Sequence, residues 1–254
     1  MPETTFNTLF IGKNTIELER IESTNSYAKN LLNEGKPIEG TLVWAHEQTA
    51  GRGQMGNTWQ SEGQKNLTAS FILYPDFLSA DKQFFLNMAV SLAVKDCCED
   101  FLTDEIRIKW PNDIYCGDKK LGGILIENSL SGSALQSTVI GIGLNVNQTA
   151  FAADVPNPTS LQIATGKSFI VHQVLERLCV YLEKYYLQLR QLHFNFLDRA
   201  YTDAMYRYQQ THEFKKGEQV FKGEINGVGK DGRLIIHSQG KEHRFAFKEV
   251  EYIL

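Results

Sequence analysis

The sequence is poor in cysteine and has neither a long apolar run nor a signal peptide. Its four cysteines include one adjacent pair and no Cys-x-x-Cys spacing, so they do not match a zinc site and predict reduced thiols. No apolar stretch reaches the roughly eighteen residues that cross a bilayer. The N-terminal segment lacks a basic head followed by a long apolar stretch. The sequence therefore predicts a cytoplasmic protein with no membrane span.

An excess of basic residues is also absent. The 254 residues carry a formal net charge of −4 at pH 7, which argues against a large nucleic-acid footprint but is compatible with a local basic pocket. The chain lacks the GxxxxGK[ST] phosphate loop and the GxSxG nucleophile pattern, and its six histidines form no set with metal-ligand spacing. With 42% apolar residues, the composition fits one large globular domain, or one large and one small.

Hydrophobic patterning predicts an α+β fold in which strands precede a long helical segment. A helix is expected after Ser23 or Thr24, either of which can cap it, and Gly35 would end it. Apolar residues at helical spacing predict another helix over residues 82–101, and residues 168–209 read as two more. Short apolar, β-branched runs predict strands at 40–48, 66–74, 105–110, 113–117, 120–128 and 135–147.

The pattern changes after about Thr211. Short strands alternate there with the turn dipeptides Asn226-Gly227, Asp231-Gly232 and Gln239-Gly240, which suit tight hairpins. A module of this size is near the lower limit for independent stability, so it is expected to dock on the larger domain. We therefore expect a main domain over residues 1–210 and a small β domain over residues 211–254.

Residues 51–67, GRGQMGNTWQSEGQKNL, form a glycine-rich loop between two predicted strands. Glycine lets backbone N–H groups approach an anion closely, and the forked guanidinium of Arg52 can add a permanent positive charge. This combination suits a carboxylate or a phosphate. The alternative is a flexible surface loop whose glycines serve only the turns.

A second polar segment, KWPNDIYCGDKKLGGILIE, spans residues 109–127. It places several lysines beside Asn112 and Asp113 in a strand–turn–strand unit. Asp113 could bind a cation such as Mg²⁺, and the glycine pair 122–123 would let a ligand approach the backbone. The alternative is an ordinary polar hairpin, because Pro-Asn-Asp is good turn chemistry.

Two shorter segments contain further candidates. GIGLNVNQ, residues 141–148, has two glycines that would weaken an apolar strand unless another group approaches closely, or the strands simply pack closely there. ESTN, residues 22–25, ends in three small hydrogen-bonding side chains at the start of a predicted helix. These side chains suit a helix cap, and their free hydroxyls also suit a polar ligand head.

Taken in order, ESTN, EQTAGRGQMGNTWQS, KNLTASFIL, KWPNDIY, KKLGGILIE and GIGLNVN resemble the successive motifs of the biotin–protein ligases. Their order and spacing match across residues 16–150, and the C-terminal β module fits the same family. The resemblance implies an α+β catalytic domain with a mixed sheet, related to class II aminoacyl-tRNA synthetases and lipoate ligases, followed by a small SH3-like domain.

The resemblance also implies a reaction in two steps. The biotin carboxylate attacks the α-phosphate of Mg-ATP to give biotinyl-AMP, and a lysine of a biotin carboxyl carrier domain, such as that of acetyl-CoA carboxylase, then displaces AMP. Family members often pair through sheet edges, so a homodimer is expected. Because the ligase pattern starts near Ile16, the preceding residues are too few for a DNA-binding helix-turn-helix domain, and a monofunctional ligase that does not bind DNA is expected.

By resemblance, each candidate residue receives a role. Lys120, Arg52 and Asp113 would be catalytic, with Lys120 bridging the biotin carbonyl and the α-phosphate and Asp113 also holding Mg²⁺. The residues that would bind biotin are Ser23, Thr24, Asn25, Gln48, Gly51, Arg52, Gly53, Gln54, Lys120 and Gly123. The residues that would bind ATP are Trp59, Lys109, Asn112, Asp113 and Asn145.

The sequence departs from the family pattern in two places. Gln54, Met55 and Asn57 stand where many members carry arginine, so the loop has lost three positive charges. Ile253 lies where many members have an arginine near the nucleotide. Two alternatives therefore accompany the ligase hypothesis: a lipoate or octanoate ligase-like enzyme, which would usually carry an RRxSGGG loop, and a catalytically weak biotin-binding sensor.

Overall fold

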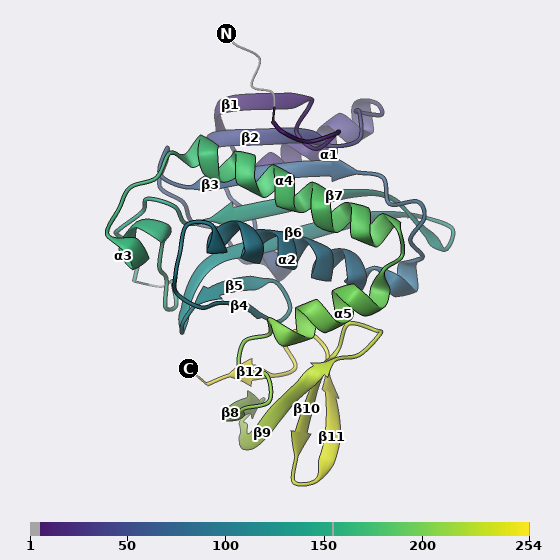
Figure 1. The fold of residues 1–254 in the computed structure, drawn as a ribbon, viewed down its shortest axis with the longest axis vertical. Coiled ribbons are helices and arrows are strands. Elements are labelled where there is room, and N and C mark those ends of the chain that lie inside the picture. The colour runs from purple at the N-terminus through teal and green to yellow at the C-terminus, as the bar shows by residue number, and fades with distance from the viewer. Residues whose placement is uncertain (1–5, 154, 254) are drawn as a thin grey trace.

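The computed structural model describes residues 6–153 and 155–253, so residues 1–5, 154 and 254 of the two expected domains lie outside the described part. The described chain forms a large sheet with helices on both faces and a smaller second sheet (Figure 1). None of its helices is both long enough and apolar enough to cross a membrane.

The large sheet has seven strands in the order β1-β2-β3-β7-β6-β5-β4. β1 and β2 are parallel, whereas all other neighbours are antiparallel, so the expected mixed sheet is confirmed. The strands are β1 (Thr15–Ile21), β2 (Thr41–Gln48), β3 (Leu67–Leu73), β4 (Ile106–Lys109), β5 (Asp113–Cys116), β6 (Lys119–Ser131) and β7 (Ala134–Leu144).

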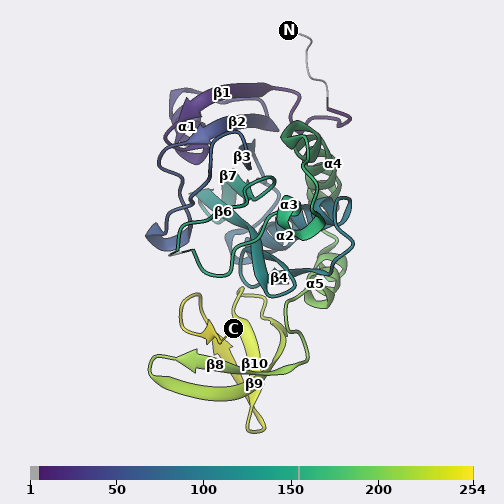
Figure 2. The same cartoon turned by 90° about the vertical axis from the view of Figure 1, so that its left-hand side faces the viewer.

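Helices cover the two faces of this sheet unequally. One face carries α2 (Phe84–Glu99) and α4 (Val171–Arg190), with α5 (Phe194–Asp203) below them, and the other carries α1 (Thr24–Glu34) (Figures 1 and 2). The main core lies on the α2–α4 side, and a small cluster around Ala28 and Val139 lies under α1. Since α1 covers only part of its face, the rest of that face is open to a ligand. A short helix, α3 (Leu161–Thr165), follows the sheet.

The local signals in the sequence position α1 correctly. Ser23 is the N-cap, with its hydroxyl oxygen accepting from the Ser26 N–H at 3.5 Å, and Gly35 follows the last turn. The expected helix over 82–101 and the pair over 168–209 are also confirmed. Because the cap fixes where α1 begins, the side chains of residues 23–25 are buried against the sheet at its N-terminus.

The second sheet has five antiparallel strands in the order β11-β10-β9-β8-β12. Asp231-Gly232 and Gln239-Gly240 lie in turns between strands, as expected, but the turn expected at Asn226-Gly227 is wrong. Ile235 pairs with Gly227 and Ile236 with Ile225, so Asn226 is an extra residue in a bulge within β9. The strands are β8 (Thr211–Lys216), β9 (Gln219–Val228), β10 (Leu234–Ser238), β11 (Lys241–Phe245) and β12 (Glu251–Tyr252).

The second sheet docks on the end of the large one near β4 and β5 (Figure 1). Trp110 donates its indole N–H to the Gly232 carbonyl at 3.0 Å and meets the Phe247 ring edge-on at 6.3 Å. Arg207 donates to the Ile253 carbonyl at 2.7 Å. These contacts place the segment after β11 beside the turn between β4 and β5.

Candidate active site

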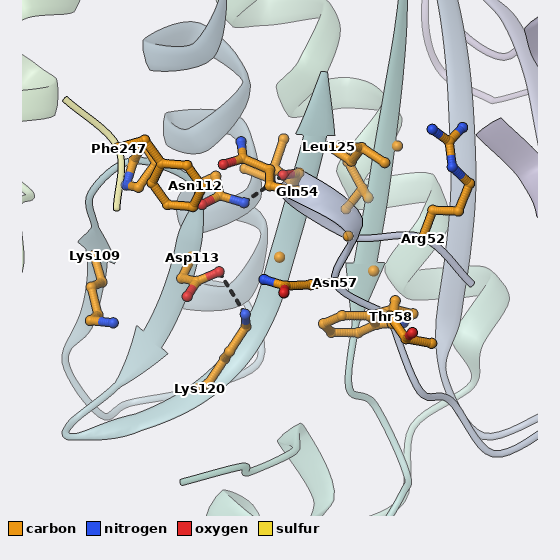
Figure 3. Close-up of a pocket in the computed structure, with 18 of the residues that line it drawn as sticks. Arg52, Gln54, Asn57, Thr58, Lys109, Asn112, Asp113, Lys120, Leu125 and Phe247 are labelled. Carbon is orange, nitrogen blue, oxygen red and sulfur yellow. Dashed lines mark hydrogen bonds and ion pairs between the residues drawn. The ribbon is translucent and has the colours of Figure 1, made fainter. Parts of the chain in front are cut away.

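A pocket of about 300 Å³ opens on the face of the large sheet that α1 only partly covers. Side chains from β2 and α1 line it. Side chains from the 51–59 loop, β5, β6 and the C-terminal segment also line it and are labelled in Figure 3. Of the residues assigned by resemblance, those that line it are Ser23, Thr24, Asn25, Gln48, Arg52, Gly53, Gln54, Trp59, Lys109, Asn112, Asp113, Lys120 and Gly123. Gly51 and Asn145 are not among the lining residues.

One end of the pocket is a network of uncharged polar side chains. Oε1 of Gln48 accepts hydrogen bonds from both the N–H of Thr24 (2.8 Å) and its hydroxyl (3.0 Å). The Ser70 hydroxyl lies between Thr24 Oγ1 (2.7 Å) and Asn25 Oδ1 (2.6 Å). Among the described residues, the Gln48 amide N–H groups and the Ser23 O–H donate to nothing, so both remain available to a ligand acceptor.

Two glycines of β7 make room for this end of the site. A Cβ on Gly141 would lie 2.2 Å from Asn25 Oδ1, and one on Gly143 would lie 2.4 Å from Trp59 Cε2. Of the two alternatives left open for the GIG strand, the structure shows close approach by other groups, namely the Asn25 and Trp59 side chains. The Trp59 ring covers Gly143 and reaches Gly123, with 3.4 Å between its Cζ3 and the position of an added Cβ.

The 51–59 loop folds back on itself. Trp59 donates its N–H to Gly51 (2.9 Å) and Gly53 donates to Asn57 (2.7 Å), so Arg52 and Thr58 form a bridge in which Arg52 makes no backbone hydrogen bond. Gly51 allows this closure because a Cβ there would lie 2.3 Å from the Trp59 carbonyl oxygen.

The Arg52 guanidinium points away from Asp113 and Lys120 (Figure 3). It makes two bonds to Glu127, from Nη1 to Oε2 (3.1 Å) and from Nη2 to Oε1 (3.0 Å). Burial raises the pKa of Glu127, but hydrogen bonds from Asn25, Lys29 and Arg52 outweigh burial and hold the pKa below its ordinary value. Glu127 is therefore charged at neutral pH.

Opposite charges meet at the other end of the pocket. Lys120 Nζ lies 2.7 Å from Asp113 Oδ1, and the two side chains point toward each other from β6 and β5 (Figure 3). The Lys120 backbone is fixed on both sides, because its N–H donates to Asn157 (2.7 Å) and its carbonyl accepts from Thr159 (2.9 Å). This anchoring holds the Lys120 side chain over the pocket.

Lys109 adds a second cation beside this pair. Its ammonium lies 5.2 Å from the Tyr115 ring centre and 4.9 Å from that of Tyr252, which comes from the second sheet. Burial lowers the pKa of Lys109, while the nearby Asp113 carboxylate works in the opposite direction. Lys109 makes no ion pair or hydrogen bond among the described residues, so its charge is available to an anionic ligand.

Two asparagines hold the site in shape. Asn112 and Ile124 exchange hydrogen bonds, from the Asn112 amide to the Ile124 carbonyl (2.8 Å) and from the Ile124 N–H to the Asn112 carbonyl (2.9 Å). Asn145 is buried, and its side chain donates to the Thr159 carbonyl (2.9 Å). Asn112 thus fixes the turn that presents Asp113, and Asn145 fixes the segment that holds Lys120.

Within the described residues, no three histidine, cysteine, aspartate or glutamate side chains gather as a metal site. Asp113 lies in the pocket lining with Oδ1 at 2.7 Å from Lys120 Nζ, and its carboxylate is an oxygen donor of the kind that Mg²⁺ prefers. Mg²⁺ is commonly bound by one or two carboxylates together with nucleotide phosphates and water. The residues present therefore fit a metal that enters with a nucleotide.

Comparison with known proteins agrees with this geometry. The sequence model of the biotin/lipoate A/B protein ligase family matches residues 17–145, about half of the chain. The chain belongs to the biotin/lipoate A/B protein ligase family.

Individual ligases of this family resemble the chain over most of its length. It is 32% identical over 234 residues to the bifunctional ligase/repressor BirA of Bacillus spizizenii, covering 90% of this chain and 71% of that protein. It is 29% identical to a biotin–[acetyl-CoA-carboxylase] ligase of Paracoccus denitrificans, covering 86% and 92%. The biotin protein ligase from Aquifex aeolicus, solved with biotin and ATP, superposes with a TM-score of 0.79 at 26% identity, covering 95% of this chain and all of that one.

This ligase-family chain also has residues at or beside the pocket that its sequence did not single out. Glu127 does not line the pocket, but it binds two residues that do, Asn25 and Arg52. In the KKLGGILIE segment, Gly123 and Leu125 line the pocket on one face of β6. Every second residue of a strand lies on the same face, so Glu127 lies on that face too. Strand alternation was thus a usable signal. Residues after β11 also line the pocket, and no local pattern announces them: Phe247, Lys248, Val250, Glu251 and Tyr252.

Proposed function

We propose that this protein is a biotin–protein ligase that uses ATP to attach biotin to a lysine of a biotin carboxyl carrier domain. A carboxylate oxygen of biotin attacks the α-phosphorus of ATP, and pyrophosphate leaves. The lysine amine then attacks the biotinyl carbonyl carbon, AMP leaves, and the amine gives up a proton. The observation that carries the proposal is one pocket with neutral hydrogen-bond donors at one end and lysines at the other.

Biotin would lie with its ureido head at the neutral end. The ureido carbonyl needs hydrogen-bond donors. Gln48 Oε1 accepts from the backbone N–H and the hydroxyl of Thr24, so the Gln48 amide N–H groups point elsewhere and remain unpaired within the described chain. The Ser23 hydroxyl proton is the other donor without a partner among the described residues. Thr24 and Asn25 would orient these donors through Ser70. Gly53 and Gln54 would line the route to the carboxylate, where the Arg52 N–H has no backbone partner, and Gly51 would act by letting the loop close on Trp59.

ATP would lie at the charged end. Lys120 would bridge the biotin carboxylate and the α-phosphate, and thereby offset the negative charge that grows in both attacks. Two anions must be held in contact for the first attack, so a fixed cation between them contributes directly to reaction geometry. Asp113 would leave Lys120 when phosphate arrives, contribute a carboxylate oxygen to the Mg²⁺ that accompanies ATP, and assist deprotonation of the acceptor lysine.

The remaining assignments follow from the same pocket. Trp59 would separate biotin from the nucleotide, with Gly123 leaving room beside it, and Lys109 would add charge near the phosphates. Asn112 and Asn145 would act on ATP by fixing the segments that carry Asp113 and Lys120. The close agreement with a ligase solved with biotin and ATP supports this arrangement.

Finer features of architecture and assembly belong to the same proposal. The main unit, residues 1–210, would be a class II aminoacyl-tRNA synthetase-like domain, and residues 211–254 an SH3-like domain. The outer edge of β1 pairs with no other described strand, which is compatible with a homodimer through that edge. The four cysteines are free, as suits a reducing cytoplasm.

One experiment tests the function. The protein is incubated with Mg-ATP, biotin and a purified carrier domain, and the carrier is probed for attached biotin. Because the matching family also includes lipoate ligases, a parallel reaction contains lipoate and a lipoyl domain. Labelling of the biotin carrier alone is expected. Labelling only with lipoate would favour the lipoate ligase, and no labelling despite a biotin-raised melting temperature would favour a sensor.

A further inference from the structure

Glu127 lies where the neutral end of the pocket meets the 51–59 loop. Its side chain is only 21% exposed, and both carboxylate oxygens are occupied. Oε1 accepts from Lys29 Nζ (3.1 Å) and Arg52 Nη2 (3.0 Å), and Oε2 accepts from Asn25 Nδ2 (3.0 Å) and Arg52 Nη1 (3.1 Å). A single carboxylate therefore contacts both a side chain of the neutral end and the loop.

On one side, Glu127 fixes the orientation of Asn25. An amide can present either its oxygen or its NH₂ in a given direction, and neighbouring groups decide which. Glu127 and the Leu125 carbonyl (3.3 Å) can only accept, so together they draw the Asn25 NH₂ toward β6 and leave Oδ1 to the Ser70 hydroxyl at 2.6 Å. Ser70 Oγ also lies 2.7 Å from Thr24 Oγ1. The backbone N–H and the hydroxyl of Thr24 both donate to Gln48 Oε1 and so fix the orientation of the Gln48 amide. Glu127 thus lies at one end of a row of contacting polar side chains that runs through Asn25, Ser70 and Thr24 to Gln48.

On the other side, Glu127 anchors the loop. A forked, two-bond contact between a guanidinium and a carboxylate restrains the direction of the arginine as well as its distance. Among the described residues Glu127 is the only acidic partner of Arg52. The bridge between Arg52 and Thr58 and the bond from Trp59 to Gly51 transmit this restraint to Trp59, which covers the middle of the pocket.

We propose that Glu127 is a positioning residue that couples recognition of the biotin head group to closure of the 51–59 loop, through Asn25 on one side and Arg52 on the other. The inference rests on the proposed function for the identity of the head group. Binding at the neutral end fixes Asn25, Asn25 fixes Glu127, and Glu127 holds Arg52 and the loop over the remaining pocket.

The decisive variant is Glu127→Gln. It keeps the volume and an oxygen that can accept from Asn25, but it removes the negative charge that holds Arg52. Biotin affinity is measured by calorimetry, and amide hydrogen exchange is followed in residues 51–59 and in α1, with and without saturating biotin. In the wild type, biotin slows exchange in both segments. In Glu127→Gln, protection of α1 remains, protection of residues 51–59 is lost, and biotin binds about tenfold more weakly.

Two control variants separate positioning from general damage. Lys29→Gln removes the third cation on Glu127 but leaves Asn25 and Arg52 in place, so coupling persists. Glu34→Gln changes an exposed glutamate at the end of α1 with no ion pair or hydrogen bond among the described residues, and it should match the wild type. If Glu127→Gln fails to fold, Arg52→Gln takes its place, because it breaks the coupling on the loop side and leaves the Asn25–Ser70 contact.

Steady-state rates give a second measurement. Glu127→Gln should raise the KM for biotin with a much smaller change in kcat, whereas loss of a group that acts on the reacting atoms would lower kcat. Equal biotin-dependent protection of residues 51–59 in the wild type and in Glu127→Gln overturns the inference. A wild type that neither binds biotin nor labels a carrier would instead refute the proposed function, so the two failures are distinct.

Discussion

The Lys120 ammonium lies 2.7 Å from Oδ1 of Asp113, although β6 and β5 pair out of simple register at this point. The register shift between Ile114 and Tyr115 lets Lys120 reach back along β5 to the carboxylate. The pair is partly exposed, at 27% for Lys120 and 19% for Asp113, so it can open to a ligand. Asp113 thus holds Lys120 in the place where, in the proposed reaction, two substrate anions would meet.

Replacing Lys120 by alanine should therefore stop the chemistry without unfolding the protein. We expect the rate of carrier labelling to fall about 100- to 1,000-fold, the usual loss when one fixed group that stabilises growing charge is removed. The melting temperature should change little, because the pair is near the surface. The rate of pyrophosphate release, followed with biotin and ATP alone, measures the first step directly.

Lys119→Ala is the matched control for this change. Lys119 is adjacent in sequence but exposed and outside the pocket lining, so its removal should leave the rate near that of the wild type. An undiminished rate in Lys120→Ala would contradict the catalytic role assigned to Lys120.

Gly143→Ala tests whether the Trp59 ring must lie against β7. An added Cβ would be 2.4 Å from Trp59 Cε2, closer than two carbons can approach, so the ring has to move. We expect biotin affinity to fall by about tenfold or more, with loss of about 1–3 kcal/mol in the free energy of unfolding. Gly35→Ala is the control, because a Cβ there meets no atom within 4 Å. Unchanged biotin binding in Gly143→Ala would show that Trp59 takes no part in closing the pocket.

Lys109 should make stability depend on pH in a predictable direction. Burial lowers its folded-state pKa below the ordinary 10.5, with Asp113 opposing and Lys120 and Arg207 reinforcing the shift. At pH values between the lowered pKa and 10.5, the unfolded chain binds more protons at Lys109 than the folded chain does. The free energy of unfolding therefore rises with pH in this window. Below the window Lys109 is charged in both states, so the full cost of burying the charge lowers the stability there.

The test compares Lys109→Met with the wild type by urea unfolding at pH 7.5 and at about pH 10.5. The free energy of unfolding of the variant, minus that of the wild type, should be more positive at the lower pH. The variant should also bind ATP more weakly, because it lacks a cation that faces the pocket. A difference that grows more positive as pH rises would contradict the assigned burial of the charge.

The sequence was sufficient for those parts of the fold that local patterns control. The cap at Ser23, the stop at Gly35 and the apolar spacing of α2 each depend on neighbouring residues, and each is confirmed. Asn226-Gly227 misled because the same dipeptide suits a tight turn and a bulge. The bulge forms because β9 pairs with β10 in this register, and that pairing cannot be read from the dipeptide itself.

In the candidate site, too, local sequence patterns identified some features, whereas others depended on long-range packing. The residues brought to the pocket by contiguous motifs, such as Gln48 and Asp113, were identifiable from the sequence. The Arg52–Glu127 pair joins residues 75 apart, and its partner choice depends on how β6 lies beside the loop. Asn145 lies in a motif but turns its amide to Thr159, outside the pocket lining. Sequence patterns thus identified the strands of the site, while side-chain direction depended on packing.

Lys248 is the one lysine that the described residues of the second sheet contribute to a pocket whose loop lacks arginine at residues 54, 55 and 57. It lines the pocket beside Phe247 and makes no ion pair or hydrogen bond among the described residues. Its backbone has a φ of 66°, in the left-handed region that costs a non-glycine residue about 1–2 kcal/mol. A strained backbone and an unpaired charge at the pocket together suggest that the position serves a ligand rather than stability.

Two substitutions at Lys248 separate the effect of its charge from the effect of its strained backbone. Lys248→Ala removes the charge and keeps the strain, so the KM for ATP should rise about three- to tenfold while biotin affinity stays unchanged. Lys248→Gly removes both, so it should weaken ATP to the same degree and yet raise the free energy of unfolding by about 1 kcal/mol. Lys241→Ala, an exposed lysine of β11 outside the pocket lining, is the control. An unchanged KM for ATP in both Lys248 variants would mean that the second sheet contributes only shape to the nucleotide site, because no other lysine or arginine of its described residues lines the pocket.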